Sequence, residues 1–174
     1  MDLDFYNVDP DYIKYLFNYD NHVCLHKNGR PYLGIVFEFN NHDYFAPLTS
    51  DNLNDKKGKD SKEYLRKDAG YRRITVDIGK KDNQKIGFVR INNMIPVPKK
   101  CYKKMIINDI VDDRKYKILL LKQYRVFITP EFQQEVQIKT KRVYKISLNK
   151  NHHLNNKVCD FQLLEEKCDS WENK

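Results

Sequence analysis

The chain has 174 residues, of which 40% are hydrophobic and 32% are charged, and its formal net charge is +8. This length supports one domain with its own core, so we expect residues 1–174 to form a single domain. The excess of Lys and Arg favours a polyanionic partner such as nucleic acid, although ordinary solubility charge is an alternative. No apolar run reaches the ~20 residues that span a bilayer, and the acidic start MDLDFYNVDP is unlike a secretory signal, so we expect a cytoplasmic protein.

None of the four cysteines lies in a C-x-x-C motif, and we expect all of them to be thiols in a reducing cytosol. No combination of cysteine and histidine matches the usual spacing of a zinc site, and the carboxylates near residue 110 fit a helical surface better than a nuclease metal site. We therefore expect no cofactor. The cysteines are Cys24, Cys101, Cys159 and Cys168.

The first predicted element is a helix. Asp9 followed by Pro10 predicts an N-cap and a first helical residue, with the helix ending near Tyr19. Tyr12 lies with two further tyrosines on a face next to the apolar stripe, and two interpretations stay open: packing at the edge of the core, or stacking on unpaired bases. The apolar stripe consists of Ile13, Leu16 and Phe17.

Strands follow. Residues 30–48 predict two strands joined near Asn40 and Asn41. Residues 71–79 and 84–91 predict a second pair of strands, and the two prolines of the segment MIPVP suit an edge of the sheet or an exit from it.

Helical patterns dominate the rest of the chain. Residues 108–128 have apolar residues at helical spacing, and a second helix opens with Pro130 at its first position. Asp160 is predicted to be the N-cap of a short final helix. The predicted fold class is α+β, with a small twisted antiparallel sheet and helices packed beside it.

The basic residues are clustered. Residues 137–158 contain no acidic residue, a second cluster spans residues 99–104, and a third follows Ser50 and contains Lys56 and Lys57. Aromatic residues lie among these clusters, which favours nucleic acid, because cations neutralise phosphates while aromatic rings stack on bases. The absence of a helix-turn-helix or zinc-finger pattern favours single-stranded or looped RNA over duplex DNA. Three cations of the first cluster step by three along one predicted helix face: Lys139, Arg142 and Lys145.

The second predicted strand ends on two adjacent hydroxyls, Thr49 and Ser50. No G-x-S-x-G motif surrounds Ser50, so a hydrolase nucleophile is not indicated. RNA offers another route, because its own 2′-OH can attack the neighbouring phosphate while side chains hold the backbone in line and stabilise the developing charge. In a hairpin, the start of one strand lies near the end of the next, which would bring Arg30 close to the two hydroxyls. The alternative is that Thr-Ser before Asp is an ordinary loop opening.

Four segments together resemble the ToxN/AbiQ family, the endoribonuclease toxins of bacterial type III toxin–antitoxin systems. In chain order they are FY…DPDYIKYL, RPYLGIVFEFNNHDYFAPLTS, INNMIPVP and CDFQLLEEKC. The most specific parts are H-x-Y-x-A-P-L-[TS]-S and F-x-L-L-E-E-K. Residues 52–85 and 99–151 match only loosely.

The resemblance implies a compact, barrel-like antiparallel sheet of the Kid/MazF/CcdB type with flanking helices. It also implies metal-independent cleavage of single-stranded RNA, cellular mRNA included, to 2′,3′-cyclic phosphate and 5′-hydroxyl ends. The implied partner is a small pseudoknot RNA antitoxin, cut from a repeated precursor, that holds the toxin inhibited in a closed RNA–protein assembly. Some members act in phage defence by abortive infection. A catalytically silent RNA-binding module is the alternative function.

The resemblance also assigns residues. Thr49 and Ser50 fall on the family's catalytic hydroxyl pair, and Arg30 falls where ToxN has its active-site lysine, with Lys27 as another nearby cation. An arginine stays charged and cannot act as a general base, but it can stabilise a phosphorane. The implied RNA-binding residues near this site are Tyr12, His26, Asn28, Lys56 and Lys57.

Overall fold

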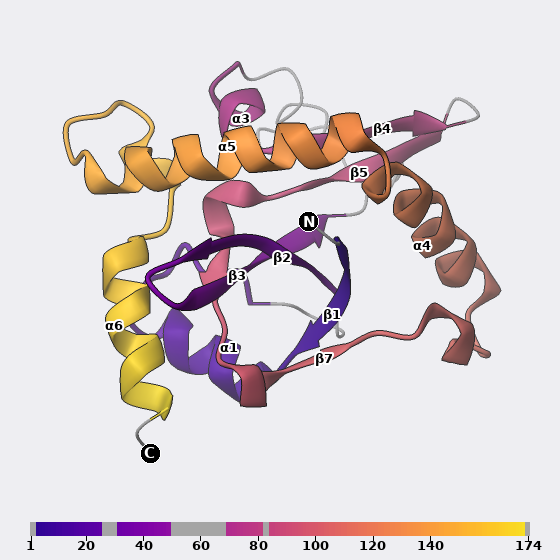
Figure 1. Ribbon diagram of the computed structural model, residues 1–174, viewed down its shortest axis with the longest axis horizontal. Helices are drawn as coiled ribbons and strands as arrows, with labels where there is room; N and C mark the ends of the chain where they lie inside the picture. Colours follow the sequence, from indigo (N-terminus) through magenta and orange to yellow (C-terminus); the bar gives the residue numbers. More distant parts are fainter. Residues whose placement is uncertain (1–2, 26–30, 50–68, 82–83, 173–174) are drawn as a thin grey trace.

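The computed structural model describes residues 3–25, 31–49, 69–81 and 84–172 (Figure 1). An antiparallel sheet forms the centre, α5 crosses one side of it, and α1, α4 and α6 pack around its margins. The α-helices of the described residues are α1 (Pro10–Phe17), α3 (Ala69–Ile74), α4 (Arg114–Phe127), α5 (Pro130–Leu148) and α6 (Phe161–Glu172). Short 3-10 helices occur at η1 (Ile91–Asn93), η2 (Lys99–Cys101), η3 (Ile107–Asp109) and η4 (Asn155–Lys157).

Among the described residues the sheet has seven strands, in the order β4-β5-β3-β2-β1-β7 with β6 paired to β3 beside this path. Every pairing between these strands is antiparallel. The strands are β1 (Asp4–Val8), β2 (Tyr32–Phe39), β3 (His42–Thr49), β4 (Val76–Lys81), β5 (Gln84–Val89), β6 (Ile95–Pro96) and β7 (Tyr102–Lys104).

The first hairpin confirms the predicted pair of strands. β2 and β3 are joined at Asn40 and Asn41, whose φ angles of 48° and 63° lie in the left-handed region. Two consecutive residues with positive φ are typical of the tight hairpin turn whose twist matches the flanking strands, and Asn tolerates this conformation better than most residues.

The helix starts also follow the sequence signals. Asp9 caps α1 by accepting a hydrogen bond from the amide of Asp11 at 2.9 Å, and Pro10 is the first helical residue. Pro130 opens α5. Asp160 precedes α6 and accepts from the amide of Leu163 through its side chain. These caps satisfy amides that the first helical turn leaves without a partner inside the helix.

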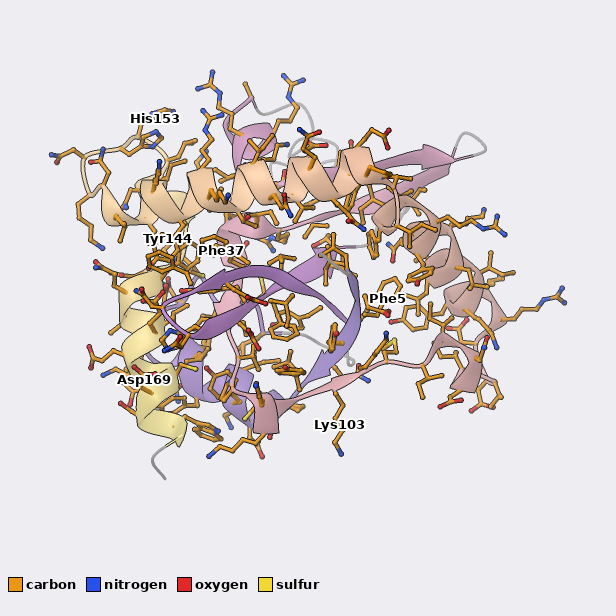
Figure 2. All side chains as sticks on the ribbon, viewed as in Figure 1. Phe5, Phe37, Lys103, Tyr144, His153 and Asp169 are labelled. Carbon is orange, nitrogen blue, oxygen red and sulfur yellow. The ribbon has the colours of Figure 1, made fainter. Side chains whose placement is uncertain are left out.

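A buried polar network ties α6 to α5 and to β3. The hydroxyls of Tyr44 and Tyr144 both donate to Oε1 of Glu165, at 2.6 and 2.9 Å. Tyr144 also packs against Phe37 of the hairpin, 5.6 Å between ring centroids (Figure 2). Burial is the main cause that raises the pKa of both tyrosines. Glu165 belongs to the F-x-L-L-E-E-K segment, so a fold contact explains its presence there.

The predicted barrel-like closure is not confirmed. β3 and β5 pair through Leu48–Val89 and Thr49–Phe88, and the β4–β5 ribbon then runs on beside α4 (Figure 1). Within the described ranges no pairing joins the two ends of the path, β4 and β7, so the chain has a mixed fold of helices and open antiparallel sheet. Similarity to the Kid/MazF/CcdB type stays a prediction.

The predicted strand over 71–79 was wrong in its first half. Residues Ala69–Ile74 are helical as α3, and the hydroxyl of Thr75 donates to the carbonyl of Tyr71, which closes the last turn. β4 begins at Val76. The β-branched residues in this segment indicated a strand, but the helix places Ile74 in the core at 0% exposure.

Candidate functional site

The end of β3 lies between two other strands. On one side, the amide of Leu48 donates to the carbonyl of Pro31, directly before β2, at 3.4 Å. On the other side, the carbonyl of Pro47 accepts from the amide of Arg90 at 3.0 Å. The sequence predicted that the start of β2 would meet the end of β3, and this part of the prediction is confirmed at Pro31 and Leu48.

The register places Thr49 in a row of side chains on one face of the sheet. Thr49 lies opposite Phe88, and Phe88 lies opposite Asp77 of β4. Directly opposite residues in an antiparallel pair point to the same face, and residues two apart along a strand share that face. Thr49 is 9% exposed, so its hydroxyl is presented at the boundary between the core and the surface.

Gly87 fixes the position of the Thr49 backbone. A Cβ on Gly87 would lie 2.3 Å from the carbonyl oxygen of Thr49, and Gly87 has φ +124°. Only glycine has both the space and the backbone freedom for this position. An isolated glycine inside a predicted strand signals a close backbone approach, so the sequence carries a signal for this contact.

Gln123 supports the same strand from α4. Its side chain is 3% exposed, and its Nε2 donates to the carbonyl of Ile86 at 2.8 Å. The same nitrogen lies 3.4 Å from the position that a Cβ on Gly87 would take. Sequence patterns offered no way to find this residue, because its partner lies 37 positions away in the chain.

Most of the predicted catalytic and RNA-binding residues lie outside the described residues, and their assignment stays a prediction. Of the predicted catalytic set, the structure describes Thr49. The predicted site residues outside the described ranges are His26, Lys27, Asn28, Arg30, Ser50, Lys56 and Lys57.

Tyr12 is part of the core. Its ring is fully buried, its hydroxyl donates to the carbonyl of Pro96 at 2.7 Å, and burial raises the pKa of that hydroxyl. The ring packs edge-on against Trp171. For Tyr12, the structure favours core packing over base stacking, because no ring face is left for a base in this conformation. Tyr19, which the sequence predicts on the same helix face as Tyr12 and Tyr15, is 48% exposed.

Lys139 does not share the environment of Arg142 and Lys145. Its ammonium donates to the carbonyls of Arg72 at 3.0 Å and Thr75 at 2.7 Å. It also forms an ion pair with Glu135 at 2.7 Å. Lys139 therefore fastens α3 and the start of β4 to α5, a role that local spacing did not indicate.

The exposed basic surface of α5 contains Lys141, which the sequence analysis did not select. Lys141, Arg142 and Lys145 lie opposite the helix face that packs on the core, and within the described ranges none of the three side chains makes a hydrogen bond or an ion pair. They border a shallow depression of about 470 Å³. This depression, called here the α5 groove, is lined by Ile138, Lys141, Arg142, Lys145, Ile146, Asn149 and His152.

Two features are absent from the described part of the chain. It contains no group of three or more His, Cys, Asp or Glu side chains placed to hold a metal ion. None of its helices combines the length and apolar character needed to cross a membrane. Cys24, Cys101, Cys159 and Cys168 form no disulfide in the structure.

Comparison with known proteins identifies relatives over nearly the whole chain. The family model described as Toxin ToxN, type III toxin-antitoxin system, matches residues 4–169. Endoribonuclease ToxN from Bacillus thuringiensis subsp. kurstaki is 34% identical over 98% of this chain and 84% of its own length. Endoribonuclease AbiQ from Lactococcus lactis subsp. lactis is 30% identical over 100% of this chain and 92% of its own length.

Solved structures agree with these sequence matches. One solved structure concerns a bacterial type III toxin–antitoxin system in which a non-coding RNA pseudoknot selectively inhibits the toxin. Its chain superposes on the present chain with a TM-score of 0.81 at 32% identity. AbiQ, a lactococcal anti-phage endoribonuclease of a type III system, superposes with a TM-score of 0.79 at 28% identity. In both cases the match covers 100% of each chain. The present chain therefore belongs to the ToxN family of type III toxin–antitoxin system toxins.

Proposed function

We propose that this protein is an endoribonuclease toxin that cleaves single-stranded RNA, including cellular mRNA and the precursor of its own RNA antitoxin. The observation that carries the proposal is the position of the end of β3. In a chain of the ToxN family, this strand delivers Thr49, the first residue of the proposed hydroxyl pair, between the start of β2 and the end of β5.

The proposed reaction needs no protein nucleophile. The ribose 2′-oxygen forms a bond to the adjacent phosphorus, the bond from phosphorus to the 5′-oxygen breaks, and the products are a 2′,3′-cyclic phosphate and a 5′-hydroxyl. The 2′-OH loses a proton and the leaving 5′-oxygen gains one. The hydroxyls of Thr49 and Ser50 would hold the phosphate in line, and Arg30 or Lys27 would stabilise the charge on the phosphorane.

Arg30 fits charge stabilisation and not proton abstraction, because a guanidinium stays protonated. His26 is the proposed residue that could move a proton near neutral pH. The reaction as proposed uses no metal ion, so cleavage should continue in excess EDTA. Loss of cleavage in EDTA, with recovery on adding Mg²⁺, would contradict this part of the proposal.

The proposed partner is a small pseudoknot RNA antitoxin that inhibits the toxin within a closed RNA–protein assembly in the cytoplasm. The α5 groove supports an RNA partner, because its three neighbouring cations form no hydrogen bond or ion pair within the described part of the chain. Neutralising RNA phosphates would release counterions and make the affinity depend on salt. The structural relatives, which include a toxin inhibited by an RNA pseudoknot and an anti-phage endoribonuclease, add support for this partner and for a role in phage defence.

Substitution of the proposed catalytic groups tests the function. Expression of the wild-type chain should arrest growth, and Ser50→Ala or Arg30→Ala should relieve the arrest while RNA binding is largely kept. Purified wild-type protein should produce RNA fragments with cyclic phosphate ends. If the wild-type protein binds RNA but no fragments form under any condition, the catalytically silent RNA-binding module becomes the better description.

A further inference from the structure

Arg90 directly follows β5 and lies beside the candidate site. Its amide donates to the carbonyl of Pro47, and the register that pairs Leu48 with Val89 continues to place Arg90 opposite Pro47. Pro47 in turn lies opposite Tyr32 on its other side. Because Pro47 and Thr49 are two residues apart, Arg90 shares the sheet face of Thr49.

The register also sets the approximate separation. Arg90 is the diagonal neighbour of Thr49, since Thr49 lies opposite Phe88. Diagonal neighbours in an antiparallel pair are roughly 7–8 Å apart at the backbone, which a long side chain can span. The alternating residues Leu48 and Val89 point to the other face and are buried in the core, at 4% and 0% exposure.

The guanidinium of Arg90 is a half-buried charge without an anionic partner in the described part of the chain. Its Nε is buried and makes no hydrogen bond, and neither of its other nitrogens forms one to a described residue. Burying a cation costs free energy unless a counter-charge or hydrogen bonds compensate, so a charge in this state favours an anionic partner beyond the described residues.

The neighbouring groups do not supply that partner. The guanidinium is close enough to favour the thiolate of Cys159, but burial outweighs this effect and raises the pKa of Cys159 well above its ordinary value, so the thiol stays neutral. Asp20, which also acts on Cys159, already accepts hydrogen bonds from the amides of His22 and Asp160 and from the His22 ring. An incoming phosphate would provide the missing negative charge.

We infer that Arg90 binds the non-bridging oxygens of the phosphate that is cleaved and is a further catalytic residue of this chain. The inference rests on the proposed function. As the 2′-oxygen adds to phosphorus and the 5′-oxygen leaves, the extra charge develops on those non-bridging oxygens, and a planar guanidinium can donate two parallel hydrogen bonds to them. The register already holds the Arg90 backbone diagonal to Thr49 before substrate binds, so only the side chain has to adjust when the charge develops.

Charge-removing variants test the role of Arg90. Arg90→Met and Arg90→Gln keep an unbranched side chain of similar thickness but remove the charge, and Arg90→Lys restores a charge without the planar fork. Arg125→Met is the matched control, because it removes one arginine charge from an exposed position of α4. The measurements are the single-turnover cleavage rate of a defined RNA, the Kd for the same RNA with a 2′-deoxy group at the cleaved position, and Tm.

The expected result is a loss of about 10²-fold or more in cleavage rate for Arg90→Met and Arg90→Gln, in line with removal of one charge-stabilising donor. Tm should hold in both, since the side chain makes no hydrogen bond within the described protein. The Kd for the 2′-deoxy RNA should rise by less than about tenfold, because a single phosphate contact is lost. Arg90→Lys should recover part of the rate, and Arg125→Met should cleave as the wild type does.

Cleavage by either charge-removing variant within threefold of the wild type would overturn the inference. Unfolding of both charge-removing variants would also overturn the inference, because Arg90 would then serve the fold and not the chemistry. If only one variant unfolds, the cleavage rate of the other decides. If Ser50→Ala abolishes cleavage while Arg90→Met does not, the proposed function stands and this inference fails. If the wild-type protein cleaves no RNA, both fail together.

Discussion

Replacing Gly87 by alanine should disable the candidate site by moving the backbone of Thr49. The new Cβ would lie 2.3 Å from the Thr49 carbonyl oxygen, and real Cβ contacts almost never fall below 3.0 Å. The end of β3 or the β5 backbone must therefore shift by at least about 0.7 Å. Because a misplacement of roughly 1 Å can cost about 10²-fold in rate, cleavage should fall by one to two orders of magnitude.

The substitution should also reduce stability. Holding a non-glycine residue at φ +124° costs on the order of 1–3 kcal/mol. Overpacking adds roughly 1–3 kcal/mol, and each kcal/mol lowers Tm by about 2–4 °C in a chain of this size. Thermal unfolding measured beside single-turnover cleavage separates the two effects.

Gly79 provides the matched control. It also has a positive φ, +92°, but a Cβ there would meet nothing within 4 Å. Gly79→Ala should therefore introduce backbone strain without the clash, and it should lower Tm. At a temperature where the variant is folded, it should keep nearly all of the cleavage activity. Equal losses of activity in the two variants, or full activity in Gly87→Ala, would refute the claim that Gly87 positions Thr49.

Three other outcomes are expected. Glu165→Ala should lower the free energy of unfolding by about 1–3 kcal/mol for each of the two buried tyrosine hydroxyls that it leaves without an acceptor. Urea unfolding measures this loss, and Tyr144→Phe should show a smaller one. Equal stability of the wild type and Glu165→Ala would contradict the network. Above about pH 10, stability should fall, because buried Tyr12, Tyr32, Tyr44 and Tyr144 keep their protons in the folded state while the unfolded chain loses them. Urea unfolding between pH 9 and 11 tests this, and a flat profile would contradict it. Arg142→Ala and Lys145→Ala should each reduce the slope of log RNA affinity against log salt concentration by about one. Lys139→Ala should mainly lower Tm, because Lys139 bonds to carbonyls of the protein. An unchanged slope in the first two variants would show that the α5 groove does not touch RNA.

Much of the secondary structure was predictable because its signals are local. The turn at Asn40 and Asn41 and the caps at Asp9 and Asp160 depend on residues only a few positions apart. The start of β4 was mispredicted because β-branched residues in 71–79 suit a strand, whereas the chain uses Ile74 as the buried end of a helix. The closure of the sheet depends on how far β3 and β5 pair, which no local pattern encodes.

The site was predictable in part for the same reason. The meeting of Pro31 with Leu48 follows from hairpin geometry, so the position of the hydroxyl pair relative to the start of β2 could be predicted. Lys139 and Arg142 look alike in sequence, but of the two only Lys139 donates to the carbonyls of Arg72 in α3 and Thr75 directly before β4. Arg90 gave no signal, because its neighbours Pro47 and Cys159 are distant in the chain.

The most direct test is a single-atom change in the substrate. An RNA with one cleavage position, mapped with wild-type protein, is compared with the same RNA carrying deoxyribose on the 5′ side of that phosphodiester. The expected result is complete loss of cleavage at the modified position, with a 2′,3′-cyclic phosphate and a 5′-hydroxyl on the products of the unmodified RNA. Continued cleavage of the deoxyribose-containing strand at that position would contradict attack by the ribose hydroxyl.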